Sequence, residues 1–343
     1  MTACDFDKVT TLPIILFEVF VLMGSVGALF VLGRLTDHLL KRFVVVLAGV
    51  LIFEVFTSPM WLNYKLGTWA YIYQDVSWVL AVGWSALILT IVTAVDHIFS
   101  RWSTGRRFAL YLVVLTALVF VLEAIVVGLG IRRYSPEVLE TVIGVFVAGV
   151  PLEALYYVPV FMTLVICLYK YWAFRIDDEL LVPVGRTNWV RNLLLTAGGV
   201  LLFELMIEPM VVNANFPRWS YIYNDITFLM TGIWVVLISL ATIAVDRFFV
   251  HWSIRRRFVA YILAVGALAL PLESFFIRAG FRVYGPSAEA NFTGFVTPIT
   301  NVAAEIAFAI PLYMALIIAF VRFWEIVGDQ QRAERLAQAG AAV

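Results

Sequence analysis

The sequence predicts an all-α, polytopic membrane protein with about nine transmembrane helices in two parallel internal repeats. Three observations lead to this fold class. The 343 residues are 63% hydrophobic with a mean hydropathy of +0.95, which is typical of membrane proteins and not of soluble globular chains. Nine apolar runs each reach about 20 residues, the length that crosses a bilayer core of roughly 30 Å. One residue pattern also recurs at an offset of about 150 positions.

The expected helices follow from the apolar runs, taken in chain order. The first run lacks a basic leading segment and a small-residue cleavage site, so we interpret it as a span and not as a signal peptide. The nine runs lie near 12–33, 43–63, 76–95, 108–130, 150–172, 190–212, 226–245, 258–280 and 302–324.

The distribution of basic residues predicts the orientation of the chain. Of the 24 lysines and arginines, 17 fall in the C-terminal tail and in or beside the loops after spans one, three, five and seven, and seven fall on the other side. Cytoplasmic loops of membrane proteins carry such an excess. We therefore expect an integral protein of the cell inner membrane, with the N-terminus outside and the C-terminus in the cytoplasm.

The internal repeat divides the chain into two four-span halves. Phe53-Glu54 matches Phe203-Glu204, and Leu122-Glu123 matches Leu272-Glu273. An even number of spans separates the copies, so the repeats are parallel in the membrane. The expected organisation is a leading helix (1–40), a first repeat (41–174), a cytoplasmic linker (175–189), a second repeat (190–325) and a cytoplasmic tail (326–343).

Composition excludes several classes of function. The net charge is zero, so nothing points to nucleic acid as a partner. Cys4 and Cys167 are far apart, and we expect neither a disulfide nor a cysteine metal site. Three histidines cannot supply the ligand set of a membrane di-iron oxygenase. We expect no metal and no cofactor.

The most informative residues are glutamates at membrane depth, because a charged side chain at the bilayer centre costs roughly 2.5 kcal/mol or more. Seven expected spans each carry at least one. They are Glu18, Glu54, Glu123, Glu153, Glu204 with Glu208, Glu273 and Glu305. Each could simply join helices by hydrogen bonds worth about 1 kcal/mol. As a set they indicate a polar cavity.

Buried carboxylic acids can protonate a carbon–carbon double bond, and aromatic rings stabilise the cation that forms. Tyr156 and Tyr157 follow Glu153 by one helical turn, and Trp69 and Tyr71 follow Glu54 along the chain. The cytoplasmic ends of two spans carry Asp96 and Asp246. We expect them to form ion pairs with Arg106-Arg107 and Arg256-Arg257, although these basic clusters could also bind anionic head groups or a diphosphate.

One segment resembles a known family. Residues 121–172 contain Leu122-Glu123, Gly130, Tyr134-Ser135-Pro136 and Pro151-Leu152-Glu153-Ala154-Leu155-Tyr156-Tyr157-Val158-Pro159. This pattern resembles the lycopene cyclase domain of carotenoid biosynthesis, a small membrane unit that occurs in pairs and carries Pro-x-Glu-Glu followed by an aromatic pair and a proline. The match covers about fifty residues, and its counterpart at 271–324 is weaker. Ala154 stands in place of the second glutamate of the motif, and Ala303 stands where the second copy would have proline.

The resemblance implies a cofactor-free enzyme, an isomerase or intramolecular lyase, that protonates an acyclic end group and closes a ring. Its partners would be membrane lipid and a lipophilic isoprenoid or carotenoid. The expected catalytic residues are Glu153, Glu305, Glu123 and Glu273. The expected substrate-binding residues are Glu54, Glu204, Glu208, Tyr156, Tyr157, Trp69, Trp219, Tyr71 and Tyr221.

Two other functions stay open at this point. A non-catalytic carrier of lipid or polyene, or a proton-coupled transporter, would use the same glutamates to hold protons or cations. A cyclase should have an aromatic-lined cavity open to lipid, whereas a transporter should have a water-accessible path to one face. A purely structural subunit should have its glutamates paired and no cavity.

Overall fold

The fold is described from a computed structural model, which covers residues 10–63, 65–177 and 188–340, with side chains given up to residue 332. Cys4, Lys8 and most of the expected linker lie outside the described residues. Nine long helices run through the described part of the chain. They are α1 (Leu12–Leu32), α2 (Leu39–Thr57), α3 (Trp78–Ile98), α4 (Thr104–Gly128), α6 (Ala154–Ile176), α7 (Trp189–Ile207), α8 (Phe228–Phe248), α9 (Ile254–Arg278) and α11 (Ala304–Gly340).

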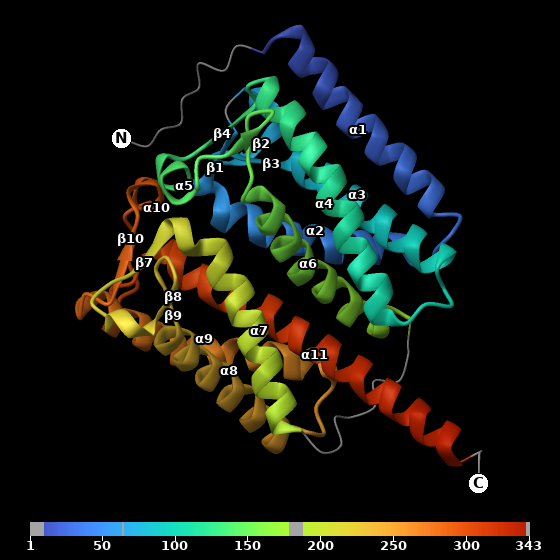
Figure 1. Cartoon of the computed structure of the whole chain (residues 1–343), viewed down its shortest axis with the longest axis vertical. Helices are drawn as coiled ribbons and strands as arrows, with labels where there is room; N and C mark the ends of the chain where they lie inside the picture. Colours follow the sequence, from blue (N-terminus) through green and yellow to red (C-terminus); the bar gives the residue numbers. More distant parts are fainter. Residues whose placement is uncertain (1–9, 64, 178–187, 341–343) are drawn as a thin grey trace.

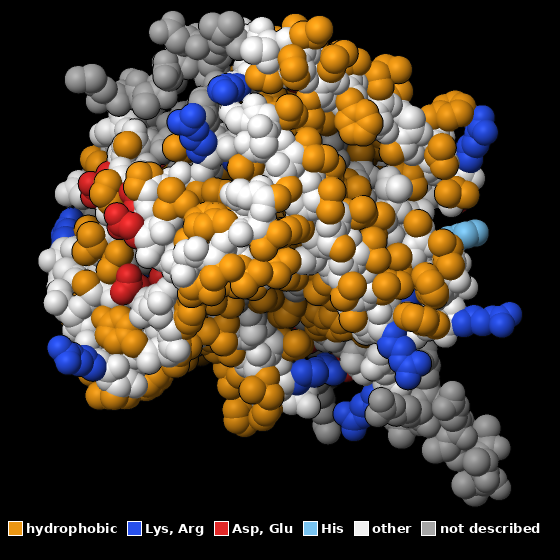
Figure 2. Space-filling model, turned by 45° about the horizontal axis from the view of Figure 1, so that its top comes forward, with side chains coloured by type: hydrophobic (Ala, Val, Ile, Leu, Met, Phe, Trp, Pro, Cys, Tyr) orange, Lys and Arg blue, Asp and Glu red, His pale blue; other side chains and the backbone are white. Residues whose placement is uncertain are grey.

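Eight of these nine helices are long and apolar enough to cross a membrane. The exception is α2, because its 19 residues include Lys41, Arg42 and Glu54. With this composition, and with only short strands between the helices, the predicted all-α membrane fold is confirmed. Large apolar side chains face outward from the helices (Phe20 is 69% exposed and Leu194 is 70% exposed). Figure 2 shows hydrophobic side chains across the middle of one face, with Lys and Arg at its margins.

The two halves of the chain have corresponding helix contacts. In the first half, α2 and α4 each pack against both α3 and α6. In the second half, α7 and α9 each pack against both α8 and α11. The halves meet where α6 lies against α11, with α7 against α6 and α2 against α11. In Figure 1, α6 and α11 run side by side through the middle of the molecule. The four long helices of each half therefore have the same set of neighbours.

The short elements gather at the end of the bundle opposite the C-terminus (Figure 1). They form five two-stranded antiparallel ladders and two short helices, α5 (Pro136–Thr141) and α10 (Pro286–Ala290). The ladders are β1 (Trp61–Asn63) with β4 (Arg132–Tyr134), β7 (Val211–Asn213) with β10 (Arg282–Tyr284), β2 (Tyr71–Tyr73) with β3 (Val76–Ser77), β8 (Tyr221–Tyr223) with β9 (Ile226–Thr227), and β5 (Phe146–Val147) with β6 (Val150–Pro151).

Proline and glycine set the path of the chain into these ladders. Pro59 and Pro209 are the second residues of two 3-10 turns, η1 (Ser58–Met60) and η3 (Glu208–Met210), which follow α2 and α7. Because proline has no backbone N–H to continue the helical hydrogen bonds, each α-helix ends here. At the ends of α4 and α9, Gly130 and Gly280 have φ angles of 67° and 71°, which glycine adopts without steric cost. These turns send the chain directly into β4 and β10.

Helix α1 lies outside the two halves and packs on α3. The contact is close: a Cβ built on Gly83 would lie 2.7 Å from Cγ1 of Val21. The Glu18 carboxylate accepts a hydrogen bond of 2.5 Å from the backbone N–H of Gly67. Glu18 therefore joins α1 to the first half.

The C-terminal helix differs from the expected arrangement. The sequence predicted a span ending near residue 324 and then a cytoplasmic tail (326–343), but α11 continues without a break over 37 residues to Gly340. A continuous helix keeps the backbone hydrogen bonds of residues around 325 satisfied, so no turn is needed there.

Candidate functional site

Two cavities occupy corresponding places in the two halves, at the end of the bundle that holds the short strands. The second-half cavity has a volume of about 410 Å³ and is lined by α7, α8, α9, β10 and α11, together with residues of the first half. The first-half cavity has a volume of about 90 Å³ and is lined by α2, α3, α4, β4 and α6. Both walls are largely apolar, and each contains a glutamate that lies five residues before the end of its long helix: Glu123 in α4 and Glu273 in α9.

That glutamate belongs to a cluster of three residues in each half. In the first half, Arg132 donates to Glu123 at 2.8 Å and the Tyr134 hydroxyl donates to the same carboxylate at 3.0 Å. In the second half, Nε of Arg282 lies 3.4 Å from Glu273. The Tyr284 hydroxyl donates to Glu273 as well. These buried carboxylates are therefore paired with a positive charge, as buried charges must be.

The ladders hold the arginines in place. Arg132 lies opposite Asn63 in the β1–β4 register, and its Nε donates to the Asn63 side chain at 2.9 Å. Arg282 lies opposite Asn213 in the same register of β7–β10. The side chains of Asn63 and Asn213 each donate to a backbone carbonyl twelve residues later, of Asp75 and Asp225. The same local construction is thus built twice.

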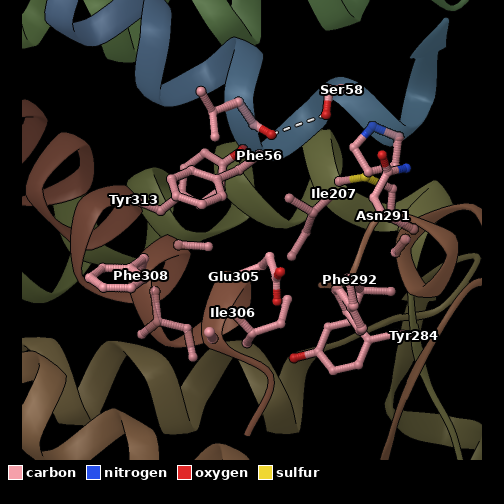
Figure 3. A pocket seen from close by; sticks show the side chains of 18 of the residues that line it. Phe56, Ser58, Ile207, Tyr284, Asn291, Phe292, Glu305, Ile306, Phe308 and Tyr313 are labelled. Atoms are coloured by element: carbon pink, nitrogen blue, oxygen red, sulfur yellow. Dashed lines mark hydrogen bonds between the residues drawn. The ribbon is translucent and has the colours of Figure 1, made fainter. Parts of the chain in front are cut away.

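Glu153 and Glu305 also have matching surroundings. Oε1 of Glu153 accepts from the backbone N–H of Ile143 at 2.7 Å, and Oε1 of Glu305 accepts from that of Thr293 at 2.6 Å. In both residues the second oxygen, Oε2, is buried without a hydrogen-bond partner among the described residues. Their positions differ in one respect: Glu305 lines the second-half cavity, whereas Glu153 lines neither of the two cavities. Figure 3 shows Glu305 projecting into the middle of that cavity, between Phe308 and Tyr284.

The other predicted glutamates lie near these cavities in different ways. Glu54 lines the first-half cavity, and its Oε2 is buried without a partner among the described residues. Glu204 accepts a hydrogen bond of 2.5 Å from the Thr231 hydroxyl. Glu208 is 4% exposed and lies in η3, beside Asn224. Neither Glu204 nor Glu208 lines either cavity.

Of the predicted aromatic residues, Tyr157 lines the first-half cavity. The hydroxyl of Tyr156 lies 3.4 Å from that of Tyr223 in the other half. The remaining four lie in the short strands and 3-10 turns between the long helices and line neither cavity. Trp69 and Trp219 are 52% and 70% exposed, Tyr71 accepts from the backbone N–H of Leu66, and Tyr221 donates to the backbone carbonyl of Asn213.

The first half closes part of the second-half cavity. Tyr73 and Gln74 belong to its lining, and the Gln74 amide donates to the backbone carbonyl of Asn291 at 3.0 Å. Nearby, the Glu137 carboxylate accepts from the backbone N–H of Ser287, its own counterpart in the second half, at 2.6 Å. Burial raises the pKa of Glu137, but hydrogen bonds, including that from Ser287, outweigh this effect and leave the pKa below its usual range.

Two pairs of corresponding lining residues differ in size in the same direction as the two volumes. Tyr157 in the wall of the first-half cavity corresponds to Ala309 in the second, and Trp61 corresponds to Val211. The rings of Trp61 and Tyr157 pack edge to face, with centroids 5.9 Å apart. These two side chains fill the space that Ala309 and Val211 leave open.

Several lining residues were not among the predicted site residues. Arg132 and Arg282 pair with the glutamates, and Tyr313 lines the second-half cavity with a buried hydroxyl that has no partner among the described residues. A signal for the arginines was present, because Arg132-x-Tyr134 and Arg282-x-Tyr284 stand 150 residues apart. Tyr313 has no such signal, since its counterpart is Phe161.

Among the described residues, no group of three or more His, Cys, Asp or Glu side chains is placed to hold a metal ion. The chain matches no protein-family model, no curated protein and no solved structure.

Proposed function

We propose that this protein is a membrane enzyme that closes a ring at the end of an isoprenoid polyene, in the second-half cavity, with Glu305 as the proton donor. One observation carries the proposal: Glu305 lines an apolar cavity of about 410 Å³, and its buried Oε2 has no hydrogen-bond partner among the described residues. Small-molecule sites are of this kind, largely apolar with a few polar groups and about 300–1,000 Å³ in volume.

The reaction would need only a proton donor and acceptor and a cavity wall that stabilises a carbocation. Glu305 gives a proton to the terminal double bond, and the resulting cation is attacked by a second double bond of the same chain, which forms the new ring bond. A proton is then lost from a carbon next to the cation, and a carbon–carbon double bond replaces the charge. The atoms of substrate and product are the same, so the reaction is an isomerisation.

Glu273 is the best-placed acceptor of that proton. It lines the same cavity as Glu305 and forms an ion pair with Arg282. Aromatic residues in the lining, such as Phe56, Phe203 and Phe292, offer ring faces to a cation. Phe308 also lines the cavity and is 68% exposed on the outward side of α11, which supports entry of the substrate from the lipid.

Pigment analysis in a lycopene-producing bacterial host tests this proposal. We expect new cyclic products with the wild-type protein, and a loss of roughly 100-fold or more with Glu305→Gln, because removal of a general acid costs about 10²–10⁴-fold. Glu289→Gln is the matched control, since Glu289 lies in the same region but is exposed. Glu153→Gln should retain activity, because Glu153 lines neither cavity.

Two outcomes would overturn the proposal. Equal product from wild type and Glu305→Gln would remove Glu305 as the acid. Polyene that copurifies unchanged with the wild-type protein, without any cyclic product, would instead support the carrier hypothesis.

A further inference from the structure

A third cavity, of about 780 Å³, lies at the opposite end of the first half, where the basic loops gather. We call it the basic-end cavity. It is lined by the end of α3, the start of α4, the end of α6 and the part of α11 around Val327, with Arg42 from α2. The function proposed above does not use it. The charge bias of the loops predicts that this end faces the cytoplasm.

Three positive side chains converge on this cavity. Arg107 donates to Asp96 at 2.9 Å, and Lys170 pairs with the other oxygen of Asp96. The ion pair between Asp96 and the Arg106-Arg107 cluster that the sequence predicted is thereby confirmed. Arg42 pairs with Asp177 and donates to the Tyr169 hydroxyl at 3.1 Å. Within the described lining, three cations therefore face two carboxylates.

The second half has a corresponding cluster of charged residues, but there a buried glutamate occupies the space between the cations. Asp246 lies 3.6 Å from Arg257 and 2.5 Å from Arg322, which confirms the second predicted ion pair. Arg322 also donates to Glu325 at 2.7 Å, and Glu325 is fully buried. The Asn192 side chain donates to the same carboxylate at 3.0 Å.

The two charged clusters differ at two pairs of corresponding residues. Glu325 corresponds to Ala173 in the first half, so a carboxylate fills the second cluster where a methyl group borders the basic-end cavity. Asn192 corresponds to Arg42, so the first half also gains a positive charge. With Arg191 paired to Asp329 at 2.8 Å, the second cluster has as many carboxylates as cations.

We infer that the basic-end cavity binds a phosphate-bearing anion, which takes the place that Glu325 fills in the second half. Arg42 and Lys170 would hold the phosphate, because guanidinium and ammonium groups are the usual phosphate ligands. Leu35, Phe174 and Val327 in the same lining suit an attached hydrocarbon. Basic pockets between helices on the cytoplasmic side of membrane proteins bind anionic lipid head groups in this way.

Lipid retention by the full-length protein in detergent tests this inference. Purified protein is titrated with dioleoylphosphatidylglycerol or dioleoylphosphatidylcholine, and bound lipid and the melting temperature are measured by native mass spectrometry and thermal unfolding. A parallel titration uses inorganic phosphate and pyrophosphate. We expect saturable binding with at least a tenfold preference for the anionic lipid, or for the soluble phosphates if the natural ligand comes from the aqueous phase.

Three variants locate the binding. Ala173→Glu introduces the carboxylate of the second half, and we expect it to weaken anion binding at least tenfold while the melting temperature without ligand is kept. Ala173→Gln fills the same space without the charge and should weaken binding less. Arg255→Gln is the control: it removes an exposed positive charge from the start of α9 in the second half and should leave binding unchanged.

The outcomes are decisive in either direction. Preference for phosphatidylglycerol that Ala173→Glu abolishes supports a lipid ligand, and protection by phosphate or pyrophosphate alone supports the same site with a soluble ligand. Equal binding of both lipids with no effect of phosphate would overturn the inference. So would an anion preference that Ala173→Glu and Arg42→Gln both leave intact.

Discussion

The first-half and second-half cavities are built from corresponding residues, but they differ in the side chains that fill the space inside them. Each has a Glu–Arg–Tyr cluster held by a short ladder, and each half has a glutamate at the start of α6 or α11 that caps a loop. In the first half, aromatic side chains fill the space beside the cluster. In the second half, alanine and valine leave it open. The comparison teaches that both halves can keep the same cluster of residues while only the second-half cavity keeps a volume suited to a polyene end group.

The largest effect is expected when the small residue Ala309 is replaced by tyrosine, the residue at the corresponding position of the first half. Ala309→Tyr puts the first half's side chain into the second-half cavity, and we expect cyclic product to fall by roughly 100-fold or more, because small displacements of a reacting group cost about that much. Product formation in the lycopene-producing host is the measurement. Overpacking can also cost about 1–3 kcal/mol, so the melting temperature must be followed.

Tyr157→Ala is the matched control for that exchange. It opens the first-half cavity and should leave the yield of cyclic product unchanged. A loss of product as large as that of Ala309→Tyr would place the reaction in the first half or across both halves.

Glu123→Gln and Glu273→Gln compare the paired glutamates. Each change removes the negative partner of a buried arginine, and breaking such a pair costs about 3–5 kcal/mol. We therefore expect similar losses of unfolding free energy for both variants, measured by thermal or denaturant unfolding in detergent. Among the protein that remains folded, only Glu273→Gln should lose cyclisation. Equal loss of activity in both would contradict the assignment of the second-half cavity.

The smallest expected effect comes from Tyr313→Phe, which gives the second half the residue that the first half has at Phe161. Because the Tyr313 hydroxyl has no protein partner among the described residues, its removal should change stability by less than about 1 kcal/mol. Conversion of a hydrocarbon polyene should also be unchanged. If the natural substrate carries an oxygen that binds this hydroxyl, its conversion should fall about tenfold, while that of the hydrocarbon does not. Product ratios from paired feeding of the two substrates measure the difference.

The predictions that depended on charge and periodicity were accurate where the structure tests them. Apolar runs of about 20 residues located the long helices to within a few residues at most ends, because the bilayer fixes their length. The ion pairs of Asp96 and Asp246 followed from a basic cluster a short loop away. The end of α11 was predicted less well, because the residues after 324 become polar although the helix continues through them and past Gly328.

The candidate site was predicted only in part, and Glu153 illustrates why. The Pro-x-Glu run and its aromatic pair drew attention to Glu153, while its counterpart Glu305 lacks the proline. The structure gives both residues the same loop contact, but Glu305 lines the second-half cavity whereas Glu153 lines neither the first-half nor the second-half cavity. Trp69 and Trp219 were expected beside a substrate because they follow glutamates along the chain, but they lie exposed in loops.

The sequence by itself determined the class of protein, the number of long helices, and which glutamates must be buried or paired. Those properties depend on hydrophobicity and length, which each segment carries on its own. Only the tertiary structure decided which buried carboxyl oxygens remain free and which half keeps an open cavity. The physical reason is that a cavity is the space left between side chains from several helices, so the exchange of Tyr157 for Ala309 acquires its meaning only after α6 and α11 have packed against their neighbours.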